Sequence, residues 1–217
     1  RGTFAEGLRY MASRPRVWTL ALVKTGWSFA GGITLVLTIL GERVYSKTLE
    51  GFSWIGDAEL LAVTVLYMSR GVGTGLGPIL SRKLCGIDPV KSERIITVSF
   101  FWAAGCYLAL GRIENLPLAS LLLILAHLGG ATVWVFSTIR LQSIVPTEVR
   151  GRVFATEQGC FTLAMGTSTY LFSTAIDLKL SSLADITSAL GLVLLVPASL
   201  WWIRGRILGY GPPKDAA

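Results

Sequence analysis

Charged residues are scarce in this 217-residue sequence, and spacings typical of metal or nucleotide sites are missing. Asp, Glu, Lys and Arg make up 15% of the chain, against about 25% in soluble domains. The cysteines at positions 85, 106 and 160 form no CxxC pair, and one histidine is too few for an HExxH motif. No GK[ST] phosphate loop is present either. We therefore expect this chain to bind no metal, cofactor or nucleotide.

Apolar residues are abundant instead, and they lie in long runs. They make up 52% of the chain, the mean hydropathy is +0.60, and several runs approach the ~20 residues of a membrane-spanning helix. Backbone exposed to lipid must satisfy its own hydrogen bonds, which favours an all-α, polytopic membrane protein. The pattern predicts a six-transmembrane-helix bundle over residues 17–203, with spans at residues 17–40, 59–80, 95–111, 117–139, 153–176 and 186–203.

The segments outside the spans are basic. Residues 1–16 read as an amphipathic lead-in, with Phe4, Leu8 and Met11 on one face of a short helix, and residues 204–217 form a tail. Fourteen Lys and Arg residues fall in the lead-in, the tail and the loops after the second and fourth spans, against four in the opposite loops. The excess predicts that both termini lie in the cytoplasm, with the chain in the inner (plasma) membrane. Because topology explains the basic residues, it also argues against nucleic acid as a partner.

Four ionisable residues lie inside predicted spans: Lys24, Arg70, His127 and Glu157. Each would cost at least ~2.5 kcal/mol if it faced lipid, so each is expected to face a partner, a polar cavity or the headgroups. They fall on the first, second, fourth and fifth spans, while the interiors of the third and sixth carry none. This distribution predicts that four spans surround a polar interior and that the other two face lipid.

Neighbouring residues extend the same faces. Tyr67 lies one turn before Arg70, Trp134 lies two turns after His127, Trp27 follows Lys24, and Gln158 begins a polar stripe on the fifth span. We interpret the set as a pathway for a small-molecule substrate. Simpler interpretations remain open for single members: packing of Arg70, His127 and the tryptophans, snorkelling or helix pairing by Lys24, or pairing of Glu157 with Arg152.

The glycines of the second span form two GxxxG pairs. Gly71 and Gly75 lie on one side of the predicted helix, and Gly73 and Gly77 lie on roughly the other. Each pair permits the close approach of a neighbouring helix. The segment does not match GxGxxG, so it is read as a packing element between two neighbours or against one sliding neighbour, and not as a phosphate-binding loop.

Two short segments carry a resemblance to a known family. GPILSRKLCG, from Gly77 to Gly86, resembles the glycine-and-arginine loop of the major facilitator superfamily, with Ser81 where an acidic residue is usual. VPTEVRGRVFA, from Val145 to Ala155, is similar to the loop entering the eleventh helix of bacterial siderophore and multidrug exporters in that superfamily. In these loops the resemblance assigns conformational roles to four residues: Gly77, Arg82, Arg150 and Arg152.

The resemblance implies a twelve-helix transporter of which this chain is the C-terminal half, built as a 3+3 inverted repeat. Its partners would be the missing N-terminal six-helix half, the lipid bilayer, a small-molecule substrate and protons. It implies export by proton-coupled alternating access. By their own chemistry, His127 or Glu157 could change charge during the cycle, and Arg70 could bind an anionic group of the substrate or modulate a neighbouring acid. A non-transporting sensor or scaffold on the same fold is the alternative, as is, less favoured, an intramembrane enzyme using His127 and Glu157.

Overall fold

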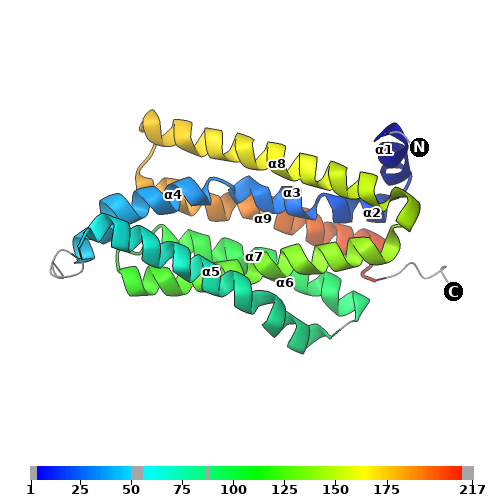
Figure 1. The fold of residues 1–217 in the computed structure, drawn as a ribbon, viewed down its shortest axis with the longest axis horizontal. Helices are drawn as coiled ribbons and strands as arrows, with labels where there is room; N and C mark the ends of the chain where they lie inside the picture. The colour runs from blue at the N-terminus through cyan, green and yellow to red at the C-terminus, as the bar shows by residue number, and fades with distance from the viewer. Residues whose placement is uncertain (1–3, 50–55, 87, 212–217) are drawn as a thin grey trace.

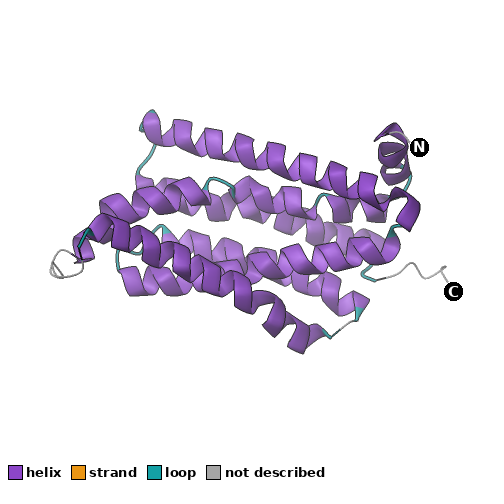
Figure 2. Ribbon diagram, viewed as in Figure 1, coloured by secondary structure: helices purple, strands orange, loops and turns teal. Residues whose placement is uncertain are grey.

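A computed structural model describes residues 4–49, 56–86 and 88–211 of the chain. Within these ranges every regular element is a helix and no strand is present, as Figure 2 shows. The prediction of an all-α chain is confirmed.

Five helical segments in the described part of the chain are long and apolar enough to cross a membrane. They are Pro15–Leu49, α5 (Ala58–Cys85), α6 (Pro89–Leu110), α7 (Leu116–Ile144) and α9 (Leu183–Leu208). The last four all begin earlier than the hydropathy runs, because side-chain caps set where they start, and all but α6 also end later. These caps are provided by Asp57, Asp88, Asn115 and Ser182.

The predicted fifth span is a helix of 31 residues, α8 (Thr147–Asp177). It is long enough to cross a membrane but is not among the five segments that are also apolar enough. Threonine and serine recur along it, and only four of its residues are buried: Val153, Thr156, Glu157 and Ser168. Length and helicity therefore agree with the prediction, whereas composition alone does not make α8 a span.

The predicted first span is interrupted. It consists of α2 (Pro15–Ala21), α3 (Val23–Trp27), the short 3₁₀ turn η1 (Ser28–Ala30) and α4 (Ile33–Leu40), followed by η2 (Gly41–Tyr45) and η3 (Ser46–Leu49). Ser168 of α8 lies against the break between η1 and α4. Its hydroxyl donates to the carbonyl of Phe29 at 2.7 Å and accepts from the N–H of Gly32 at 3.2 Å. The backbone groups released by the break are thus partly satisfied by a neighbouring helix.

The long helices lie side by side with alternating directions (Figure 1). Helix α7 packs against α5 and α6, α6 packs against α9, and α8 covers the interrupted first segment. The contact between α5 and α7 depends on glycine: a Cβ on Gly73 or Gly77 would collide with the carbonyl of Ile124 or Leu128. Gly71 and Gly75 face open space. Of the two predicted GxxxG faces, only one is packed within the described chain.

A buried ion cluster joins one end of α6, α7 and α9. The carboxylate of Glu93 accepts from Arg140 at 3.0 Å and from Arg204 at 2.6 Å, and all three side chains are buried. The sequence pattern placed both arginines in basic cytoplasmic segments as topology signals, and it did not single out Glu93. On the structure they fasten three helices together. Helix α1 (Phe4–Ala12) lies at the same end of the bundle (Figure 1).

Large apolar side chains remain exposed along the outside of the bundle. Examples are Leu60 and Leu84 on α5, Leu163 and Tyr170 on α8, and Ile207 on α9, each at least 65% exposed. Soluble monomers rarely carry extended apolar surface of this kind. This exterior is consistent with apolar surroundings, from lipid or from further helices.

Candidate functional site

A cavity of about 180 Å³ lies where the predicted pathway spans meet. Four predicted site residues line it: Trp27 of α3, Arg70 of α5, and His127 and Trp134 of α7. Phe161, on α8, completes the wall opposite α5, and its ring packs edge-on against Trp134 with centroids 5.0 Å apart. The geometry thus brings together side chains from the first, second, fourth and fifth predicted spans.

Arg70 is the cation of this cavity. Its side chain is half-buried, and its guanidinium makes no hydrogen bond or ion pair with any described residue. Arg70 lies within electrostatic range of His127 and Tyr107, neither of which is an anion at neutral pH. The other arginines held inside the bundle, at positions 140 and 204, are paired with Glu93. The uncompensated charge of Arg70 makes the cavity suited to a ligand with an anionic group.

His127 is buried and is held by a residue that sequence reasoning missed. Its Nε2 lies 3.1 Å from the hydroxyl of Tyr107 on α6, and the two rings meet edge to face. Trp27 packs against the other side of the imidazole, with ring centroids 6.4 Å apart. The third span was expected to face lipid only, but Tyr107 carries a polar group from it into the interior. A tyrosine within an otherwise apolar run was the available signal.

Tyr67 does not line the cavity but binds a residue that does. Its hydroxyl donates to the carbonyl of Thr34 at 2.9 Å and lies 3.2 Å from the hydroxyl of Thr38. Thr34 itself is part of the cavity wall. Tyr67 therefore ties α5 to α4 beside Arg70.

Lys24 and Glu157 form a buried ion pair next to the cavity. Their Nζ and Oε1 atoms are 3.2 Å apart, and the side chains are 6% and 3% exposed. The Lys24 ammonium also lies 4.5 Å from the centroid of Trp134, whose ring lines the cavity. A single aromatic ring therefore separates this ion pair from the cavity.

Two simpler interpretations of these charges do not describe the structure. Lys24 is buried and so does not snorkel to an interface. Arg152, the alternative partner of Glu157, instead binds Glu6 of α1 at 2.8 Å and the carbonyl of Glu148 at 3.1 Å. Glu157 is thus turned toward Lys24 and the interior.

The remaining predicted residues lie away from the cavity. Gln158 is exposed, with its amide nitrogen 3.4 Å from the hydroxyl of Thr162, and its place in a pathway stays a prediction. Gly77 packs against α7, and Arg82 is exposed near the end of α5. Arg150 donates to the carbonyl of Val145 at 3.0 and 3.2 Å, which holds together the start of α8. Conformational roles for these loop residues also stay predictions.

The break in the first segment forms part of the cavity wall. Ser28, Ala30 and Gly31 line it, so the interruption lies beside the cation of Arg70 and the ring of Trp27. A cavity with an uncompensated guanidinium, two indole walls and an interrupted helix can bind a small molecule with an anionic group and an apolar or aromatic body.

No family model, curated protein or solved structure matches this chain. Family and function therefore rest on the residues and on the geometry described above.

Proposed function

We propose that this chain is the C-terminal half of a secondary active transporter that exports a small molecule by proton-coupled alternating access. The observation that carries the proposal is the cavity beside the break in the first segment. Side chains from the first, second, fourth and fifth predicted spans line it, and Arg70 within it has no partner among the described residues. Interrupted helices at a site between repeats are a recurring feature of secondary transporters.

Placement in the inner membrane is supported by the exterior of the bundle. Five segments have the length and hydropathy to cross a bilayer, and apolar side chains cover the outer faces. Arg9 lies on α1, Arg150 near the start of α8, and Arg82 and Arg206 near the ends of α5 and α9. All of these parts lie toward the same end of the bundle (Figure 1). In the proposed orientation this basic end is cytoplasmic.

In this proposal α8 also crosses the membrane, as the predicted fifth span, and completes the set of six. A helix that faces a polar pathway on one side needs fewer apolar residues than one surrounded by lipid, which accounts for its low hydropathy. A Cβ added to Gly71 or Gly75 on α5, or to Gly159 or Gly166 on α8, would meet no atom within 4 Å. We assign these open faces to the missing N-terminal half, whose helices would approach closely there.

In the proposed mechanism the cavity binds the substrate, and the ion pair beside it responds to the coupling proton. Arg70 binds the anionic group of the substrate, and Trp27 and Trp134 contact its apolar part. Glu157 or His127 takes up the coupling proton. Protonation of Glu157 would release Lys24, whose ammonium lies against Trp134, so the wall of the cavity would respond directly to the proton.

Flux measurements on the full-length protein test this function. The protein is reconstituted in vesicles, and transport of small aromatic carboxylates is followed with and without a pH gradient. We expect gradient-driven flux that is lost in His127→Ala and in Arg70→Gln, and retained in Arg206→Gln, which removes an exposed arginine. Product formation without flux would favour an enzyme, and neither would favour a sensor or scaffold. Unchanged transport in His127→Ala would remove His127 from the mechanism.

A further inference from the structure

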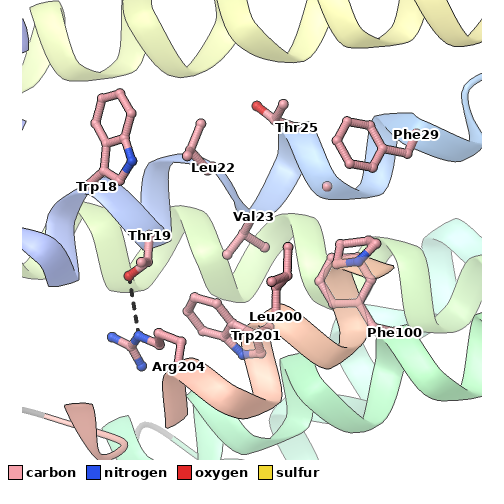
Figure 3. A pocket seen from close by; sticks show the side chains of 12 residues that line it. Trp18, Thr19, Leu22, Val23, Thr25, Phe29, Phe100, Leu200, Trp201 and Arg204 are labelled. Carbon is pink, nitrogen blue, oxygen red and sulfur yellow. Dashed lines mark hydrogen bonds between the residues drawn. The ribbon is translucent and has the colours of Figure 1, made fainter. Parts of the chain in front are cut away.

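A second cavity, of about 370 Å³, lies between the first segment and α9. Figure 3 shows Trp18, Leu22 and Phe29 along one wall and Leu200 and Trp201 along the other. The walls are apolar, and only a few polar side chains contribute to the lining. This cavity is separate from the one that holds Arg70.

The cavity opens to the outside of the bundle. Trp18 and Phe29 on its rim are 38% and 37% exposed, and Leu200 is 62% exposed. In a bilayer such an opening faces the lipid, so an occupant can enter sideways from the membrane. The apolar walls favour a hydrocarbon chain within it.

One end of the cavity is cationic. Arg204 lines this end and donates through Nε to the hydroxyl of Thr19 at 3.3 Å (Figure 3). Its Nη1 binds Glu93, but its Nη2 is buried and finds no hydrogen-bond partner among the described residues. A buried guanidinium nitrogen without an acceptor is costly, and an anionic oxygen would relieve that cost.

The charges around Glu93 do not balance. Arg140 and Arg204 share its one carboxylate, and Arg16 lies within electrostatic range of all three. The guanidinium of Arg16 donates hydrogen bonds to the backbone carbonyls of Leu208 and Gly211, which carry no net charge. The described side chains of this cluster therefore hold a net positive charge that an anion from outside would neutralise.

We infer that this cavity binds an anionic phospholipid, with the headgroup phosphate at Arg204 and an acyl chain along Trp18, Leu22 and Phe29. Basic pockets between membrane helices at the cytoplasmic side recognise such headgroups. The excess charge favours an anionic lipid such as phosphatidylglycerol over a zwitterionic one. The inference rests on the proposed placement in a bilayer but not on transport, so either proposal can fail alone.

Native mass spectrometry of the full-length protein with phosphatidylglycerol or phosphatidylcholine tests the inference. We expect wild-type protein to retain phosphatidylglycerol preferentially, and Arg204→Gln to bind it about tenfold more weakly, as for loss of one charge-assisted hydrogen bond. Arg206→Gln removes the same charge two residues along α9, from an exposed position, and should leave binding unchanged. Equal loss in both variants would overturn the inference, because it would reflect surface charge alone.

A second variant keeps the test decisive if Arg204→Gln does not fold. Leu22→Trp fills the cavity and alters no charge. It should therefore remove bound phosphatidylglycerol and leave the thermal stability of the protein unchanged. Leu192→Trp adds the same side chain at an exposed position on α9 outside the cavity and should have no effect. Undiminished phosphatidylglycerol binding in Leu22→Trp would overturn the inference.

Discussion

The ion pair between Lys24 and Glu157 gives the sharpest prediction about stability. Glu157→Gln leaves the Lys24 ammonium buried without its counter-charge. At 3.2 Å the attraction is about 5 kcal/mol for an effective dielectric constant of about 20. Breaking one partner of a buried pair typically costs about 3–5 kcal/mol. Lys24 keeps its contact with Trp134, worth about 1 kcal/mol, so we expect a loss of about 3 kcal/mol.

A double-mutant cycle measures this coupling directly. The variants are Lys24→Met, Glu157→Gln and the double variant, compared by chemical unfolding in detergent. We expect each single change to destabilise strongly and the double variant to recover most of the loss, because no unpaired charge then remains. The exposed pair Arg112–Asp185, 64% and 47% exposed, is the matched control and should show far weaker coupling. Strictly additive effects for Lys24 and Glu157 would refute the buried-pair account.

Three further predictions concern packing, capping and the cavity. Gly73→Ala should lower stability by roughly 1–3 kcal/mol, because the added Cβ meets the carbonyl of Ile124. Gly75→Ala should be neutral in this chain, because a Cβ there meets no atom. The unfolding midpoints of the two variants test this difference. The Lys91 backbone N–H donates to Asp88 at 2.9 Å, which holds the pKa of Asp88 below its ordinary 3.8. Ionised Asp88 therefore stabilises the fold above pH 3.8, and this stabilisation is lost as the pH falls through the lowered pKa. The difference in thermal midpoint between wild type and Asp88→Asn should therefore be constant above pH 3.8 and become smaller as the pH falls below it. Tyr107→Phe removes the hydroxyl that contacts His127, so it should shift the pH profile of flux while leaving expression unchanged. An unaltered profile would show that Tyr107 has no part in proton coupling.

Much of the helical fold could be predicted because hydropathy and helix caps are local signals. The runs at residues 59–80, 95–111, 117–139 and 186–203 each correspond to one helix of the structure, although most of these helices extend several residues beyond the run at one end or both. The break at η1 could not be predicted in this way. Its backbone groups bind Ser168, which is 139 residues from Phe29 along the chain, and no local pattern shows hydrogen bonds of this kind.

The ionisable residues of the candidate site were predictable, but the contacts among them were less so. An ionisable residue in an apolar run is conspicuous, so Lys24, Arg70, His127 and Glu157 could be singled out. Their partners depend on how helices pack: Lys24 meets Glu157 on α8, and His127 meets Tyr107 on a helix expected to face lipid. The Glu93 cluster was missed for the same reason, since Glu93 lies in a polar flank where charge is ordinary.

The proposed transport cycle requires the Arg70 cavity to open to each side of the membrane in turn, and thiol labelling tests this without a known substrate. Thr74 lines the cavity. Thr74→Cys is placed in full-length protein whose cysteines at positions 85, 106 and 160 have been replaced, and a membrane-impermeant thiol reagent is added to either side of oriented vesicles. We predict labelling from both sides, with a pH gradient increasing labelling on one side and decreasing it on the other. Labelling from one side only, whatever the gradient, would contradict the account.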